Sequence, residues 1–209
     1  KEEAREHIKK LTESFEEKLD FINSSAYKEV QIQYEFIIPL FKYLNWDTSN
    51  TGAIRISDRE FIFDNVIPNS RSSISKKRID ILLQLDSKKK MFIEVKHPSC
   101  NLKEELKYIQ QTYSYAYSGK INFALLTNFK EFRLFNFISK VADNGELNQY
   151  CILDWSYKDF IVNFEKLWKY FEKENVRNGS LSKFYISKKD NRISVEEAFF
   201  DDLNRWRID

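Results

Sequence analysis

Two acidic residues and one lysine stand out because they interrupt apolar segments. Asp80 lies in the segment KRIDILLQL, and Glu94 and Lys96 lie in the segment MFIEVK. Side chains two positions apart on a strand project to the same face, so Glu94 and Lys96 are expected to point together. Pairing of the two segments would set Asp80 beside them. Charged groups inside an apolar sheet are costly unless they pair with one another or bind a metal ion.

The chemistry that suits these residues is hydrolysis of a phosphodiester bond. Two carboxylates on neighbouring strands, Asp80 and Glu94, make a hard oxygen site of the kind that Mg²⁺ prefers. A metal ion held there would polarise the phosphoryl oxygen and lower the pKa of its bound water. Lys96 would position or deprotonate that water and offset the charge that grows on phosphorus. The alternative interpretation is an ion pair on the surface that contributes little to the stability of the fold.

Two helices could add residues to this site. Gln111 lies on the helix expected after the strand pair, where its amide could hydrogen-bond the attacking water or a phosphate; Gln110 is the competing choice. Glu29 lies on the helix expected before the sheet, where its carboxylate could enter the metal shell; Glu35 is the competing choice. Position alone also allows each of them to be a solvent-exposed helix residue.

Composition excludes several other kinds of site. The chain has 209 residues, of which 42% are hydrophobic, so it can bury a core. Only four glycines and three prolines argue against collagen-like, linker-like and glycine-rich phosphate-loop architectures. Two histidines and two cysteines without a CxxC spacing exclude zinc fingers and dithiol sites, and they favour a reducing compartment. The net charge of +2 gives no nucleic-acid signal, although ten basic and five acidic residues fall between 71 and 107.

The hydrophobic pattern predicts an α/β domain whose sheet mixes parallel and antiparallel pairs. Gly119 follows a helical pattern and stands where the C-cap of that helix is expected. Pro39 is expected to kink the helix that contains it. A helix between two strands predicts one β-α-β crossover. The expected helices are 3–20, 26–44, 102–118, 156–177 and 193–207, and the expected strands are 53–63, 79–85, 91–95, 121–127 and 132–138.

Four segments, in this order, resemble the PD-(D/E)xK nuclease superfamily, and more narrowly the N-terminal nuclease domain of type IIG restriction–modification enzymes. EVQIQYEFIIPLFKYLNWD is similar to the family's opening helix with its proline and tryptophan. KRID resembles the basic-x-Asp strand, and FIEVKHP resembles the Glu-x-Lys strand. QTYSYAYSGKINFALLTNFKEFRLFN is similar to the Gln-x3-Tyr helix and the two strands that follow it. The resemblance covers roughly residues 26–138.

The resemblance implies roles for individual residues. It implies that Asp80, Glu94, Lys96 and Gln111 are catalytic, with Gln111 preferred over Gln110 because it stands four residues before Tyr115. It implies that Asp80, Glu94 and Glu29 hold the metal ion, with Glu29 preferred over Glu35 because of its ten-residue spacing from Pro39. The sequence departs from the family at Asn45, which replaces a glycine before Trp46, and at Asn136, where an aspartate is common. Asparagine also tolerates the left-handed conformation that such a glycine adopts.

The resemblance also implies the setting of the domain. The expected fold is a restriction-endonuclease-like core over 26–150, preceded by an N-terminal helix over 1–25. A C-terminal helical extension over 151–209 would lead toward a downstream module, because VEEAFFDDLNRWRID resembles the helix that precedes a methyltransferase. The implied cofactor is Mg²⁺, with Mn²⁺ as a substitute. The implied partners are double-stranded DNA and the methyltransferase and specificity modules of the same chain, and two copies could meet on DNA to cut both strands.

Other observations bear on the setting and leave alternatives open. The first residues are charged and unlike a signal peptide, and no apolar run is long enough for a membrane span, so we expect a cytoplasmic protein without membrane contact. The chain starts without Met and stops within a helical pattern, which indicates a piece of a longer polypeptide. One alternative is the nuclease domain of a type I restriction motor subunit. Another is a non-catalytic DNA-binding or assembly domain of the same fold.

Overall fold

A single six-stranded sheet organises the computed structural model of the chain, which describes residues 1–53, 55–67, 77–137 and 147–184. The strands follow one another across the sheet in the order in which they occur in the chain. Five neighbouring pairs result, and all are antiparallel except β3–β4. The strands are β1 (Phe61–Ile67), β2 (Lys77–Leu85), β3 (Lys88–Val95), β4 (Phe123–Thr127), β5 (Glu131–Asn136) and β6 (Cys151–Ser156).

The parallel pair β3–β4 is joined by helix α5 (Leu106–Gly119), which is the expected β-α-β crossover. The hairpin β2–β3 turns at Asp86 and Ser87, which both have positive φ angles, of 53° and 59°. Two-residue turns with this backbone match the twist of the strands they join. The predicted α/β class, with a mixed central sheet flanked by helices, is therefore confirmed.

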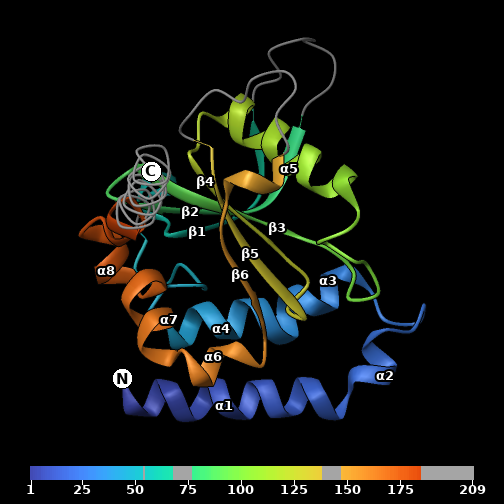
Figure 1. Cartoon of the computed structure of the whole chain (residues 1–209). Helices are drawn as coiled ribbons and strands as arrows, with labels where there is room; N and C mark the ends of the chain where they lie inside the picture. The colour runs from blue at the N-terminus through green and yellow to red at the C-terminus, as the bar shows by residue number, and fades with distance from the viewer. Residues whose placement is uncertain (54, 68–76, 138–146, 185–209) are drawn as a thin grey trace, which may run out of the picture.

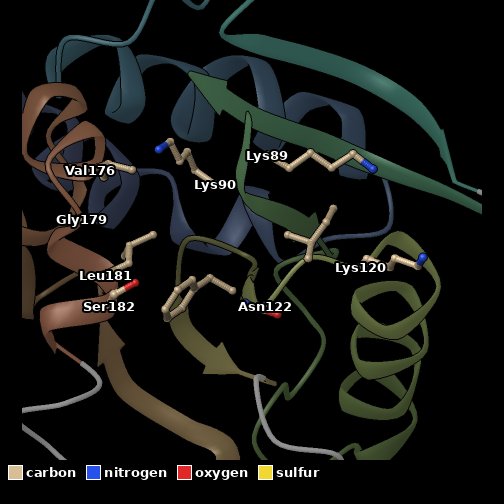
Figure 2. A pocket seen from close by; sticks show the side chains of 10 residues that line it. Lys89, Lys90, Lys120, Asn122, Val176, Gly179, Leu181 and Ser182 are labelled. Atoms are coloured by element: carbon tan, nitrogen blue, oxygen red, sulfur yellow. The ribbon is translucent and has the colours of Figure 1, made fainter. Parts of the chain in front are cut away.

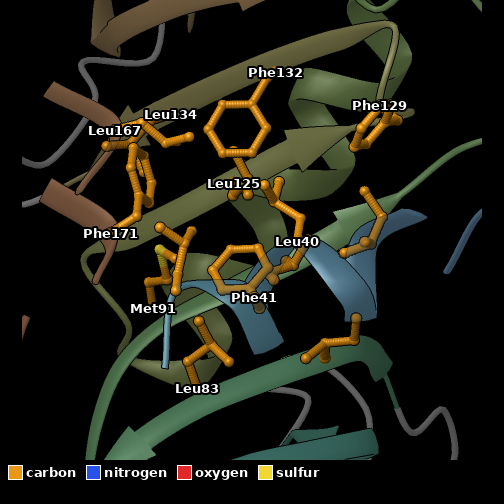
Figure 3. Close-up of a cluster of buried hydrophobic side chains, with 14 of the residues drawn as sticks. Leu40, Phe41, Leu83, Met91, Leu125, Phe129, Phe132, Leu134, Leu167 and Phe171 are labelled. Carbon is orange, nitrogen blue, oxygen red and sulfur yellow. The ribbon is translucent and has the colours of Figure 1, made fainter. Parts of the chain in front are cut away.

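Helices cover both faces of the sheet (Figure 1). Helix α5 lies on one face, and α1 (Glu2–Glu17), α4 (Ile38–Tyr43), α6 (Asp159–Val162) and α7 (Phe164–Phe171) lie on the other. The main core fills the second face, where side chains of α4 and α7 meet those of β2 to β5 (Figure 3). The remaining helices are α2 (Leu19–Ile22), α3 (Glu29–Ile32) and α8 (Lys173–Arg177), and the 3₁₀ turns are η2 (Ile56–Asp58) and η3 (Leu147–Tyr150).

The helix expected over 26–44 is divided where the proline was expected to disturb it. It consists of α3, a π-helical turn η1 (Gln33–Ile37), and α4. The backbone N–H of Ile38 donates to the carbonyl of Gln33, five residues back. Pro39 has no N–H, and its ring would clash with the carbonyl four residues earlier, so the wider π turn accommodates it.

Several predicted boundaries are wrong in detail. The segment expected to be extended over 53–63 contains η2, and strand β1 begins only at Phe61. Helix α5 does end at Gly119, but the left-handed residue is Lys120, with φ of 52°. Gly119 is closely packed instead, because a Cβ there would lie 3.2 Å from Ile121 Cδ1 and that side chain would have to shift. The helix predicted over 193–207 lies outside the described residues.

The N- and C-terminal stretches share the core of the sheet. Ile8 of α1 and Phe171 of α7 belong to the same buried cluster as side chains of the strands. Strand β6, which ends at Ser156, forms one edge of the sheet. The division into 1–25, 26–150 and 151–209 as separate parts of a longer polypeptide stays a prediction. None of the helices in the described part of the chain combines the length and the apolar character needed to cross a membrane.

Asn45 adopts the left-handed conformation that its place before Trp46 predicts, with φ of 68°. Its side-chain amide also donates to Glu172 Oε1 at 2.9 Å. Asn45→Ala should lower the free energy of unfolding by about 1–2 kcal/mol more than Asn45→Gly does, since both variants lose the hydrogen bond but only alanine is strained at positive φ. Chemical denaturation of the three proteins measures this. Equal midpoints for the two variants would contradict it.

Candidate active site

Strands β2 and β3 separate at the position of Asp80. Their ladder runs from Leu85 opposite Lys88 to Ile81 opposite Ile93, and Asp80 is the next residue of β2. Asp80 Oδ2 accepts a hydrogen bond from the backbone N–H of Val95 at 2.7 Å, so a side chain takes the place of a backbone partner. The divergence brings a carboxylate to the end of β3, where the sequence places the other charged residues.

Glu94 and Lys96 point to the same face at this end of β3, as predicted from their spacing. Lys96 Nζ donates to Glu94 Oε1 at 2.6 Å. The pair is buried, because Glu94 is 2% exposed and Lys96 is 9% exposed. The interpretation as a surface ion pair is therefore wrong: burying two charges requires a desolvation free energy that the pair recovers only with further partners.

The second carboxylate oxygen of Glu94 lacks a further partner. Glu94 Oε2 is buried and makes no hydrogen bond within the described part of the chain. A buried carboxylate oxygen without a donor is unusual, because most buried polar groups are satisfied. This oxygen is consistent with a site that receives a cation or a donor from outside the chain.

Glu29, at the first position of α3, lies within electrostatic reach of the same residues. Burial raises the pKa of Glu29, Lys96 lowers it, and Asp80 raises it. Glu35 instead interacts with Tyr27, whose pKa is raised by burial and by Glu35. The structure thus brings Glu29 rather than Glu35 to the site, as the resemblance implied.

The carboxylates oppose one another's ionisation. Burial, followed by the charges of Asp80 and Glu29, raises the pKa of Glu94 to about 8, against the effect of Lys96. Burial also raises the pKa of Asp80, while the Val95 N–H and Lys96 lower it. Burial acts to lower the pKa of Lys96, but the negative charges of Glu94, Glu29 and Asp80 have the larger effect, so the pKa of Lys96 is raised. Perturbed titratable groups in one cluster are typical of functional sites.

Gln111 is half-buried on α5, and its described hydrogen bond stays within the helix. Its amide nitrogen donates to the hydroxyl of Tyr115 at 2.8 Å. Tyr108, one turn earlier on the same side, has its ring centroid 5.7 Å from Lys96 Nζ. Gln110 is exposed. The orientation of α5 therefore favours Gln111 over Gln110, and its role stays a prediction.

His97 has a structural role that the sequence did not indicate. The N–H of Ser99 donates to His97 Nδ1 at 3.1 Å, which leaves Nε2 to donate to the carbonyl of Tyr27 at 3.1 Å. This bond ties the end of β3 to the segment that enters α3, and so it helps to place Glu29 beside Lys96. In the sequence, the only sign of this role is that a histidine directly follows the Glu-x-Lys strand.

The donor set fits Mg²⁺, although the carboxylates do not yet converge. In residues 1–53, 55–67, 77–137 and 147–184, no group of three or more His, Cys, Asp or Glu side chains is arranged to hold a metal ion. Asp80 is engaged by the Val95 N–H, and Glu94 is engaged by Lys96. The unpartnered Glu94 oxygen and the mutual repulsion of three carboxylates are the features that a divalent cation would relieve.

A separate cavity of about 220 Å³ lies at the opposite end of β3 (Figure 2). Lys89, Lys90 and Lys120 surround it, and Ile121, Phe123, Val176 and Leu181 are among its apolar lining. Figure 2 shows Lys90 pointing away from Lys89 and Lys120, so the three ammonium groups do not converge on one point. The cavity contains none of the carboxylates described above.

Comparisons with known proteins agree with the resemblance stated from the sequence. No family model matches the chain. The type II restriction enzyme and methyltransferase RM.Eco57I of Escherichia coli is 23% identical over 206 residues, which are 98% of this chain and 20% of that protein. The chain therefore spans about a fifth of the length of this relative. The alignment confirms that the chain is related to a restriction–modification enzyme.

A solved structure was also found, that of the type IIG restriction endonuclease BpuSI. The TM-score is 0.41 and the identity is 16%, over 70% of this chain and 17% of that one.

Proposed function

We propose that this chain is a metal-dependent endonuclease domain that hydrolyses phosphodiester bonds of double-stranded DNA. The observation that carries the proposal is the buried Glu94–Lys96 pair, with a free Glu94 oxygen, beside Asp80 where strands β2 and β3 separate. Burying these charged groups lowers the stability of the fold, so their presence is better explained by a function than by folding. The relation to a restriction enzyme over nearly the whole chain supports the choice of DNA as the substrate.

The chain's own residues would divide the work as follows. Asp80 and Glu94, with Glu29, would hold Mg²⁺ or Mn²⁺ through carboxylate oxygens. When bound, the metal ion supplies Lewis-acid polarisation of the phosphate and a more acidic water. Lys96 places a positive charge where negative charge develops on the phosphate. Gln111 would orient the attacking water or a phosphate oxygen after its amide leaves Tyr115.

The domain would form part of a longer polypeptide. The relative combines a restriction enzyme and a methyltransferase in one chain, and this sequence spans a fifth of it. We therefore propose that methyltransferase and specificity modules accompany the domain, and that contact with bases at the recognition site belongs to them. On this proposal, the domain needs phosphate contacts more than base-edge contacts.

Asp80→Asn tests the metal site without removing the hydrogen bond to the Val95 N–H, because the amide oxygen can still accept it. We expect the parent to nick or linearise plasmid DNA in Mg²⁺ or Mn²⁺ but not in EDTA. Asp80→Asn should bind Mn²⁺ roughly tenfold or more weakly in calorimetry. Mn²⁺ binding of the parent that is unchanged in the variant would place the metal elsewhere. DNA binding without cleavage in any divalent ion would favour the non-catalytic alternative.

A further inference from the structure

Two exposed aromatic side chains lie together at the outer edge of the sheet. Tyr34 on η1 is 64% exposed, and Phe63 on the edge strand β1 is 39% exposed. Their rings are nearly parallel, with an interplanar angle of 16° and centroids 6.5 Å apart. Val66 on β1 and Val30 on α3, the helix directly before η1, are also exposed. Large apolar side chains gathered at one place on a surface indicate a contact with another molecule.

Irregular backbone presents this pair to solvent. Tyr34 is in the π-helical turn that precedes Pro39, and single π turns occur frequently at functional sites. Phe63 is followed by Asp64, whose φ of 48° is unusual for a residue other than glycine. Both irregularities have a conformational cost, and both act on the elements that carry the aromatic rings.

The pair adjoins the candidate active site. Phe63 is opposite Ile81 in the β1–β2 ladder, and Ile81 is the neighbour of Asp80. Tyr34 follows Glu29 by five residues along α3 and η1, which is about 7.5 Å along a helix axis. The aromatic pair therefore lies next to the place where the scissile phosphate would be held.

The chemistry of this region favours a nucleobase over a second protein surface. The carboxylates repel phosphates, and the net charge of +2 supplies little general attraction for DNA. Stacking of a base on an aromatic ring gives affinity that does not depend on charge, and every base has a face to offer. The exposed Arg78, which is opposite Val66 on β2, is paired with Asp64, so it adds no free positive charge beside Phe63. The aromatic rings therefore have to supply the affinity for a nucleotide at this place.

We infer that Tyr34 and Phe63 form a stacking surface for an unstacked base of the DNA strand next to the scissile phosphate. This inference rests on the proposed function and adds to it the residues that position the substrate. The pair acts on binding of the strand rather than on the bond that breaks.

The test measures binding of single-stranded and duplex oligonucleotides of the same sequence in Ca²⁺, so that it does not depend on cleavage. Tyr34→Ala and Phe63→Ala should each weaken binding of the single strand by about 5- to 100-fold. The dependence of binding on salt should keep its slope, because no charge is removed. Tyr34→Phe should restore binding, and in Mg²⁺ the alanine variants should raise KM while leaving kcat unchanged.

Val162→Ala is the matched control, because Val162 is an exposed apolar residue on α6, on the face away from α5. Parental binding in the double variant Tyr34→Ala/Phe63→Ala would overturn the inference. So would a change of oligomeric state in that variant without DNA, since the surface would then contact protein. If the parent binds DNA but does not cut it, the proposed function is contradicted, and the binding assay still decides whether Tyr34 and Phe63 stack on a base. A parent that binds no DNA would overturn both.

Discussion

Lys96→Ala should lower the rate of DNA cleavage by roughly 1,000-fold while the chain stays folded. Lys96 is the positive charge held directly against Glu94, and the side chain is almost fully buried at the end of β3. The effect comes from loss of charge stabilisation on the phosphate and from loss of the group beside the attacking water. Single-turnover cleavage of a supercoiled plasmid in Mg²⁺ measures the rate.

The same variant should also change the protonation of Glu94. Removing Lys96 leaves a buried carboxyl without its cationic partner, so the pKa of Glu94 rises further and the carboxyl keeps its proton to a higher pH than in the parent. The double variant Glu94→Gln/Lys96→Ala should recover part of the lost stability but none of the lost cleavage. That difference separates a catalytic role from a structural one.

Lys88→Ala is the matched control, because Lys88 is an exposed lysine at the other end of the same strand. It should cleave as the parent does. Equal activity of the parent and Lys96→Ala would mean that cleavage arises from another site or from a contaminating enzyme.

The strands and their hairpin could be predicted from the sequence because their signals are local. A run rich in β-branched residues and leucine marks Ile79 to Leu85, and the polar residues from Asp86 to Lys89 mark the turn. The common face of Glu94 and Lys96 follows from the two-residue period of a strand. The structure has these features, because nothing distant in the chain is needed to produce them.

The assembly of the site could be predicted only in part, because it depends on contacts between distant segments. Pairing of the strands placed Asp80 near Glu94, but no pattern showed that the strands separate there or that Asp80 accepts the Val95 N–H. The approach of Glu29 depends on how the segment before α3 meets the end of β3, where His97 binds the Tyr27 carbonyl. Position on the helix alone left Glu29 and Glu35 as alternatives, and only the resemblance preferred Glu29.

The helical residues show the same limit. The resemblance preferred Gln111 because it stands four residues before Tyr115, but it did not reveal that the Tyr115 hydroxyl accepts a hydrogen bond from the Gln111 amide. The π turn at Gln33–Ile37 follows from Pro39 only once the helix is known to continue past it. Sequence patterns thus predict most of the elements, although strand β6 was not expected, and they predict the hydrogen bonds between side chains less well.

Glu94 should make the protein less stable as pH rises from about 4.5 to about 8. Burial raises the pKa of this carboxyl from 4.5 in the unfolded chain to about 8 in the folded one. Between these values the folded state holds a proton that the unfolded state has released. The free energy of unfolding then falls with rising pH, by about 1.4 kcal/mol for each pKa unit of difference. The raised pKa of Asp80 acts in the same direction.

Glu94→Gln removes this dependence, because glutamine resembles the protonated acid and does not ionise. Relative to the parent, the variant should gain stability steadily from pH 5 to pH 8 in urea denaturation, and it should have lost cleavage. Glu104→Gln, at an exposed glutamate, shows the effect of removing a carboxylate that is not buried. Parallel curves for the parent and Glu94→Gln would contradict the prediction.

A divalent cation should reverse the trend in the parent. Metal ions bind the ionised carboxylate, so binding to the folded state displaces the proton that Glu94 retains. The stabilisation produced by a fixed concentration of Mn²⁺ should therefore grow between pH 6 and pH 8, and it should be much smaller in Glu94→Gln. If Mn²⁺ stabilises both proteins equally at every pH, Glu94 is not a ligand, and the metal site proposed from the buried pair is wrong.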